Sequence, residues 1–90
     1  MRLEYYTAEW CSACRGLKPH VIEACNDAKV SLDFIDCGNE GNADYCIRHG
    51  VSTLPTVIFY SNEGTELDRI VGSFGKHELA KRILDARKGD

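Results

Sequence analysis

The stretch Trp10-Cys11-Ser12-Ala13-Cys14 decides the fold class, because it lies where a predicted strand gives way to a predicted helix. Residues 3–7, with the sequence LEYYT, form a short aromatic and β-branched run that is typical of a strand. From Cys11 onward, apolar positions between Leu17 and Ala28 recur at intervals of three and four, which predicts one buried helical face. The placement of the two cysteines at this junction therefore says more than their spacing alone.

The next part of the chain predicts a second strand and a short helix. Residues 30–35 alternate in polarity over about six positions, which favours a strand. Residues 37–42 are rich in glycine and asparagine and indicate a loop. Residues 43–49 are predicted to form a short helix that Gly50 closes.

The last third predicts a hairpin followed by a helix. Residues 56–60, TVIFY, are the clearest strand and are expected at the centre of a sheet. The four-residue turn 61–64 should lead into an antiparallel strand over residues 65–71. A helix with one apolar stripe follows, formed by Leu79, Ala80, Ile83 and Leu84. The order β-α-β-α-β-β-α predicts an α/β fold, a four-stranded mixed sheet flanked on both faces by three helices.

Length and composition limit the class of protein. A chain of 90 residues with 43% hydrophobic and 28% charged residues is expected to form a single domain over residues 1–90. A net charge of −3 argues against nucleic-acid binding, which needs a basic face. No apolar run is long enough to predict a membrane span, and residues 1–7 do not resemble a signal peptide, so we expect a cytoplasmic location.

Five cysteines in such a chain are unusual. A reducing compartment does not favour a structural disulfide framework, so catalysis, metal binding and core packing are the open interpretations. A cysteine in the first turn of a helix faces free N–H groups and the positive end of the helix dipole, which favour the thiolate of Cys11. Cys14, one turn later, is placed to attack a mixed disulfide at Cys11. The alternative, a zinc site, would need a second close ligand pair that the chain does not offer.

The other three cysteines and the histidines give weaker signals. Cys25 lies on the apolar helical face and is predicted to be a core residue. Cys37 and Cys46 flank the glycine-rich loop, and we favour two unpaired thiols over the alternative of a second, regulatory disulfide. No triad or metal spacing involves a histidine, so surface or helix-terminal positions are expected for all three, His20, His49 and His77.

Four motifs in the same order resemble a thioredoxin-fold oxidoreductase over nearly all of the chain. The segment Ala8-Glu9-Trp10-Cys11-x-x-Cys14 is similar to the active-site segment of that family, and Pro19 to the proline inside its active-site helix. Thr53-Leu54-Pro55-Thr56 resembles the family's cis-proline loop. Val71-Gly72 resembles the glycine turn that completes the substrate groove.

The resemblance implies a function and a set of site residues. Cys11 and Cys14 would be the catalytic residues and form the redox-active disulfide. Substrate would bind at Trp10, Thr53, Leu54, Pro55 and Gly72, with a cis peptide before Pro55. No metal and no cofactor beyond the dithiol are expected. The expected partners of this monomer are disulfide-containing proteins and a flavin-dependent thioredoxin reductase, or glutathione in its place.

The chain also departs from the family pattern. Tyr5 stands where thioredoxins commonly carry a buried aspartate, and Leu32 where a lysine is usual, so the sequence indicates no base for Cys14. Glutaredoxins share the fold and the threonine matched by Thr53, but the Gly-Gly pair of their glutathione site is missing before the last helix. A glutathione-dependent oxidoreductase remains the first alternative, and a metal-binding or adaptor module without turnover the second.

Overall fold

The computed structural model describes residues 1–90 and has the predicted order of elements. In chain order these are β1 (Arg2–Thr7), α1 (Ser12–Ala28), β2 (Ser31–Asp36), the 3-10 turn η1 (Glu40–Asn42), α2 (Ala43–Arg48), β3 (Thr56–Tyr60), β4 (Glu66–Val71) and α3 (Lys76–Arg87). Several boundaries differ from the prediction by one residue, among them the start of β1, both ends of β2, the end of α2 and the start of β4. Val30 lies outside β2 because its N–H bonds back to the carbonyl of Cys25 at the end of α1. Thr65 belongs to the turn before β4, since its carbonyl accepts from the N–H of Ser61.

The four strands form one mixed sheet in the order β2-β1-β3-β4. β1 runs parallel to β2 and antiparallel to β3, and Leu3 lies between Leu32 and Phe59 in the register. β3 and β4 form the expected antiparallel hairpin. All five residues of β3 are buried, which confirms its prediction as an interior strand.

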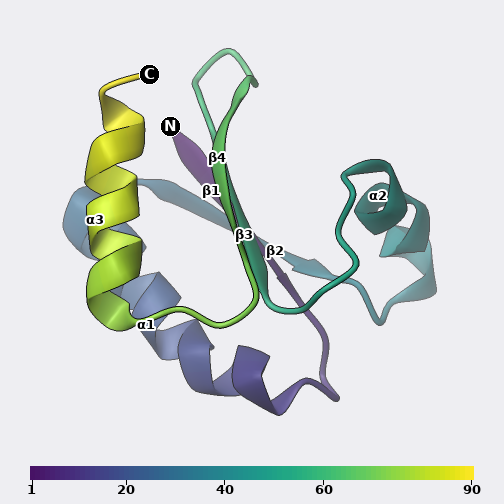
Figure 1. The fold of residues 1–90 in the computed structure, drawn as a ribbon. Helices are drawn as coiled ribbons and strands as arrows, with labels where there is room; N and C mark the ends of the chain where they lie inside the picture. The colour runs from purple at the N-terminus through teal and green to yellow at the C-terminus, as the bar shows by residue number, and fades with distance from the viewer.

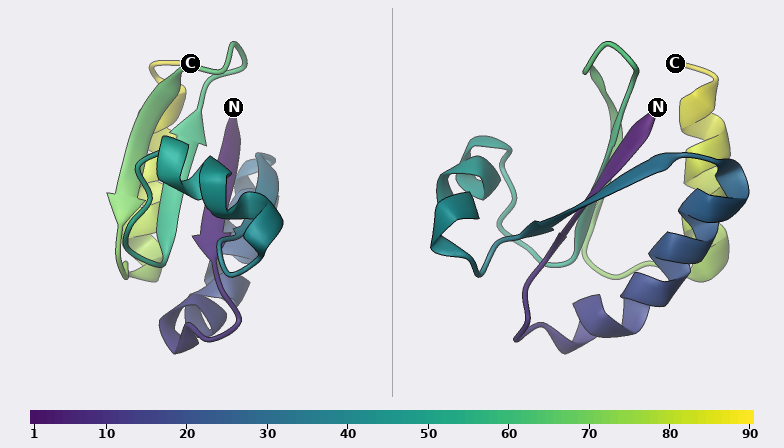
Figure 2. Two further views of the ribbon diagram at one scale, coloured as in Figure 1. Left: turned by 90° about the vertical axis from the view of Figure 1, so that its right-hand side faces the viewer. Right: turned by 180° about the vertical axis from the view of Figure 1, so that it is seen from behind.

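The helices cover both faces of the sheet, as predicted. Figure 1 shows α1 and α3 together on one side of the strands and α2 on the other, and Figure 2 shows the same separation from behind. On the side of α1 and α3, the main core includes Tyr5 and Phe59. On the side of α2, Tyr6 packs with Cys46 and Ile58. Successive residues of a strand point to opposite faces, so β1 contributes to both cores.

The ends of α1 determine how this helix meets the sheet. Pro19 lies inside the helix, where it has no N–H to donate to the carbonyl of Arg15. At the other end, Lys29 adopts the left-handed conformation with φ of 58°, and its N–H caps the carbonyls of Asn26 and Cys25. None of the helices combines the length and the apolar character that crossing a membrane would require.

Candidate active site at the start of the first helix

Cys11 is the N-cap residue of α1. Its backbone is extended, with φ of −90° and ψ of 102°, and its sulfur accepts a hydrogen bond from the N–H of Cys14 at 3.2 Å. The first turn of α1 contains no acidic residue. Unpaired N–H groups and the positive end of the helix dipole therefore act on this sulfur without a competing negative charge in the same turn.

Cys11 and Cys14 are joined by a disulfide with a Cα–Cα distance of 5.3 Å. We call this pair the catalytic disulfide. Cys14 is fully buried, whereas Cys11 retains 8% of its surface. The pair packs with Ala8, and the side chain of Leu54 covers it from the loop before β3. Of the two sulfur-bearing residues, only Cys11 keeps a surface that a substrate can approach.

Tyr5 takes the place that thioredoxins commonly give to a buried aspartate. Its side chain is fully buried, and its hydroxyl donates a hydrogen bond of 2.7 Å to the carbonyl of Cys14. Burial raises the pKa of Tyr5 to about 12, so the phenol stays protonated at neutral pH. The ring also meets Phe34 of β2 edge to face, with 6.1 Å between the centroids. Tyr5 supports the first turn of α1, but it is not a proton acceptor.

The loop before β3 carries three of the predicted substrate-binding residues, and one of them, Leu54, packs against the catalytic disulfide. The Leu54–Pro55 peptide bond is cis, and Pro55 is buried. Thr53 is exposed and Leu54 half-buried, and the carbonyl of Thr53 accepts from the hydroxyl of Thr56 at 2.6 Å. Gly72 donates its N–H to the carbonyl of Pro55 at 2.8 Å. With φ of 88°, Gly72 holds a conformation that other residues rarely adopt.

Trp10 lies at the rim of a groove beside the catalytic disulfide. Its side chain is 73% exposed, which excludes the interpretation as an ordinary packed aromatic residue. A cavity of about 560 Å³ extends from Trp10 across α2 to the loop before β3. We call it the docking groove; its lining residues include Trp10, Ile47, Val51, Thr53, Leu54 and two further cysteines, Cys37 and Cys46.

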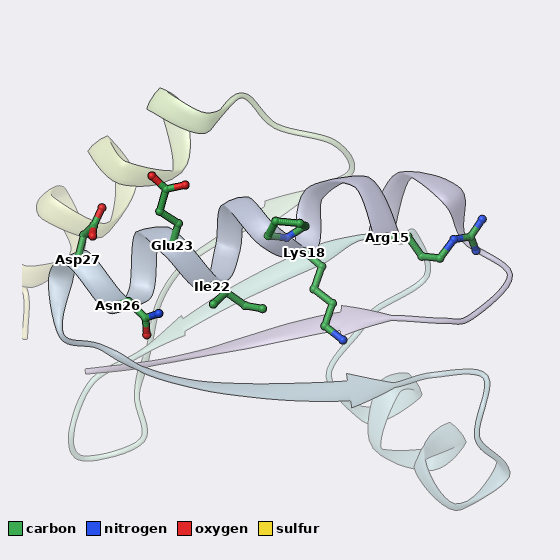
Figure 3. A pocket seen from close by; sticks show the side chains of 7 residues that line it. Arg15, Lys18, Ile22, Glu23, Asn26 and Asp27 are labelled. Atoms are coloured by element: carbon green, nitrogen blue, oxygen red, sulfur yellow. The ribbon is translucent and has the colours of Figure 1, made fainter.

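The two basic residues near the site have local partners. The guanidinium of Arg15 donates to the carbonyl of Glu9, and the ammonium of Lys18 lies 4.9 Å from the centre of the Phe34 ring. Figure 3 shows Arg15 at the start of α1 and Asp27 near its end, on either side of an exposed hollow along the helix. The basic end of this hollow is the end that carries the catalytic disulfide.

Cys37 and Cys46 form a second disulfide, with a Cα–Cα distance of 6.2 Å. The prediction of two unpaired thiols is therefore wrong, and the structure contains the alternative, a disulfide between Cys37 and Cys46. The pairing arises because Cys37 directly follows β2 at the end of the sheet that carries Cys11, and α2 packs over that end. The position of Cys37 directly after a predicted strand was a signal for only one of the two sulfurs, and it did not indicate Cys46 as the partner.

Cys25, His49 and His77 lie where they were expected. His20 does not, since it lies in the middle of α1, half-buried, with its Nδ1 buried and without a hydrogen-bond partner. Cys25 is 2% exposed in the main core, and burial raises the pKa of its thiol to about 11, so it is an unreactive core residue. His49 follows the end of α2, and its ring stacks on Tyr45 with 4.1 Å between the centroids. The structure contains no group of three or more His, Cys, Asp or Glu residues that could hold a metal ion.

This arrangement defines a class of protein. A disulfide at the N-terminus of a helix, packed against a loop with a cis-proline on a four-stranded sheet, is the site of a thiol–disulfide oxidoreductase. The thioredoxin family model matches residues 2–85, and the chain belongs to the thioredoxin family.

Relatives and solved structures agree with this assignment. The chain is 37% identical over 79 residues to thioredoxin of Chlamydia caviae, which covers 87% of this chain and 74% of that protein. It is 31% identical over 78 residues to thioredoxin of Rickettsia bellii, covering 87% and 73%. The structure of thioredoxin 1 from Thermosipho africanus superposes with a TM-score of 0.85 at 26% identity and covers 98% of this chain and 96% of that one. The chain is a protein-disulfide oxidoreductase of the thioredoxin type, and the glutaredoxin alternative is not favoured.

Proposed function

We propose that this protein reduces disulfides in protein substrates, with Cys11 as the attacking nucleophile and Cys14 as the resolving cysteine. In the first step the Cys11 thiolate attacks a substrate sulfur, a mixed disulfide forms, and one substrate thiolate leaves. In the second step the Cys14 thiolate attacks the sulfur of Cys11, and the second substrate thiolate leaves. Two electrons pass to the substrate, and the Cys11–Cys14 disulfide remains.

The observation that carries this proposal is the asymmetry of the catalytic pair. Cys11 is the N-cap and keeps 8% of its surface, whereas Cys14 is fully buried one turn later. The hydrogen bond from the N–H of Cys14 to the Cys11 sulfur stabilises a thiolate at Cys11 more than a thiol. The cysteine that keeps exposed surface is therefore also the one whose thiolate is stabilised.

The proton of Cys14 needs an exit that does not use Tyr5. A cavity of about 380 Å³ on the β2 side of the site is lined by Cys14, Glu9 and Asp36, among others. Arg15 and Lys18 also line this cavity, and its polar side chains can hold water there. We propose that water in this cavity accepts the proton of Cys14. The water takes the role that a buried carboxylate at the position of Tyr5 would have.

The docking groove supports binding of an extended peptide. Trp10 and Ile47 are each 73% exposed and offer apolar surface on the two sides of the groove. Thr53 is exposed in this groove, in a segment without strand structure that offers backbone groups to a partner strand. A groove of this kind recognises a substrate through its backbone and a few apolar side chains, so it can bind many different proteins.

Recycling completes the proposed cycle. A flavin-dependent thioredoxin reductase is the expected electron donor, supported by the similarity to thioredoxins, and glutathione is the alternative. The chain is proposed to work as a monomer in the cytoplasm, without a cofactor beyond its own dithiol. Cell fractionation and light scattering test the location and the oligomeric state, and NADPH oxidation with each recycling system tests the donor.

Insulin reduction tests the chemistry. The wild-type protein should accelerate insulin reduction by dithiothreitol, Cys11→Ser should abolish the acceleration, and Cys25→Ala serves as the control that removes a thiol outside the site. Cys14→Ser should accumulate a mixed disulfide with the substrate, because the resolving sulfur is missing. Equal rates for wild type and Cys11→Ser would reject the enzyme and favour an adaptor without turnover. Iodoacetamide that labels Cys14 before Cys11 in the reduced protein would reverse the two roles.

A further inference from the structure

The disulfide between Cys37 and Cys46 has no part in the proposed cycle, yet it lies in the same groove. Cys37 follows β2, and its N–H bonds to the carbonyl of Thr7 at 2.8 Å. Cys46 belongs to α2 and packs between Tyr6 and Ile58 on the sheet. The bond therefore ties α2 to the end of the sheet from which the active-site segment leaves.

Both sulfur-bearing residues line the docking groove together with Trp10 and Leu54. Next to Cys37, the backbone of Gly38 lies directly against the indole of Trp10, since a Cβ built on Gly38 would sit 3.4 Å from the indole Nε1. Leu54 touches the catalytic disulfide on the other side of the groove. The second disulfide thus fixes one wall of the docking groove. Leu54, in the opposite wall, covers the catalytic disulfide.

We propose that Cys37 and Cys46 are a second redox couple, and that its oxidation keeps the docking groove in the shape that binds protein substrates. The proposal rests on the function of the groove described above. In this reading the catalytic pair performs the chemistry, while the second pair adjusts how well a protein substrate docks.

The exposure of the two cysteines indicates how the couple exchanges. Cys37 is half-buried and Cys46 is 4% exposed, so a small thiol such as glutathione reaches the sulfur of Cys37. Its thiolate attacks that sulfur, the S–S bond breaks, and Cys46 leaves as a thiolate. A second thiolate then attacks the glutathione sulfur of the mixed disulfide, so that Cys37 is released and one glutathione disulfide forms. Two electrons enter the protein, and the reverse sequence restores the bond.

Reduction should loosen the groove without unfolding the domain. α2 has only six residues, too few for a helix to be stable by itself, so its position depends on its attachments. Besides the disulfide, Tyr45 donates a hydrogen bond to the buried carboxylate of Glu4 and holds α2 from the sheet side. After reduction this attachment and the backbone bond from Cys37 to Thr7 remain, whereas the covalent link that fixes α2 against Cys37, beside Trp10, is lost.

A thiol titration tests the couple directly. The variant Cys11→Ser/Cys14→Ser/Cys25→Ala retains only Cys37 and Cys46 as thiols, and it is equilibrated in buffers of varied ratio of glutathione to glutathione disulfide. Alkylation and peptide mass should show one two-electron transition between a dithiol and an intramolecular disulfide. Two alkylated thiols at every ratio, or glutathione adducts on both cysteines without the internal bond, would overturn the couple.

A kinetic comparison tests the effect on docking. Wild type with an intact second disulfide, prepared with one equivalent of dithiothreitol and checked by peptide mass, is compared with Cys37→Ser/Cys46→Ser, with Cys25→Ala as the matched control. We expect the half-saturating insulin concentration to rise roughly three- to tenfold in the double variant relative to the Cys25→Ala control, and the rate with a small aromatic disulfide to change by a smaller factor. Equal insulin kinetics would overturn the role in docking. A wild-type protein inactive on both substrates would instead reject the proposed function, and the titration stands even if the double variant does not fold.

Discussion

The buried carboxylate of Glu4 organises a polar cluster between the sheet and α2. Its side chain is 4% exposed and accepts hydrogen bonds from the hydroxyls of Tyr6, at 2.6 Å, and Tyr45, and from the guanidinium of Arg2, at 3.0 Å. Burial alone would raise the pKa of Glu4, but the three donors outweigh burial and hold the pKa below its usual value. The group is therefore charged at neutral pH, and its partners depend on that charge.

The cluster predicts a coupling free energy between Glu4 and Tyr45. Tyr45→Phe removes one hydrogen bond to a charged acceptor and should lower the free energy of unfolding by about 1.5–3 kcal/mol. Glu4→Gln removes the charge that all three donors meet and should cost about 3–5 kcal/mol. A domain of this length has a total stability of about 5–13 kcal/mol, so both variants should remain measurable.

Urea unfolding followed by circular dichroism measures the double-mutant cycle. The loss of stability in the double variant should be about 1–2 kcal/mol smaller than the sum of the two single losses, because Tyr45 has no charged acceptor left once Glu4 is neutral. Tyr60→Phe is the matched control: it removes a buried hydroxyl that has no hydrogen-bond partner, so it should cost less than Tyr45→Phe. Losses at Glu4 and Tyr45 that add to within about 0.5 kcal/mol, or equal losses at Tyr45 and Tyr60, would refute the central role of the carboxylate.

Three further predictions concern stability. Lys29→Gly should stabilise the protein by about 1 kcal/mol, because glycine tolerates the left-handed conformation, whereas Lys29→Ala should show no such gain in urea unfolding. Tyr5→Phe should lower the free energy of unfolding by about 1 kcal/mol through loss of the bond to the Cys14 carbonyl, with insulin reduction largely retained; a loss of activity without a loss of stability would contradict a supporting role. The pKa values of Glu4 and Asp68 are both lowered. At Glu4 the hydrogen bonds lower the pKa by more than burial raises it, and at Asp68 the ion pair with an arginine lowers it. In acid the unfolded chain therefore binds more protons than the folded one. The free energy of unfolding should be highest above about pH 5 and should decrease as the pH drops through the folded pKa values. In thermal melts at several pH values, Glu4→Gln should make this decrease smaller.

The order of elements could be predicted because local chemistry marks nearly every boundary. Pro55 precedes the run of β-branched and aromatic residues that became β3, and Gly50, with φ of 70°, ends α2. The change of period at that point of the chain placed Cys11 in the first turn of a helix, and in the structure it is the N-cap just before that turn. Those signals depend only on residues near each boundary, so the boundaries can be predicted without knowledge of the tertiary packing.

The contacts around α2 could not be predicted in the same way. Because successive strand residues point to opposite faces, Glu4 and Tyr5 lie on different sides of the sheet, but this alternation could not indicate that Tyr45 would contact Glu4. The pairing of Cys37 with Cys46 depends on the same docking of α2. Both depend on the angle at which a six-residue helix lies on the sheet, and tertiary packing decides that angle, not helix propensity.

The position of β1 inside the sheet has a consequence for the folding pathway. Its antiparallel ladder joins Arg2 to Tyr60 and Tyr6 to Thr56, whereas the β3–β4 hairpin closes over a short turn. Loop closure costs more entropy for the distant pair, so we expect the hairpin and α1 to form early and the β1–β3 ladder to limit the folding rate. During synthesis the active-site segment leaves the ribosome long before β3, and it acquires its fixed geometry only when that later strand arrives to pair with β1.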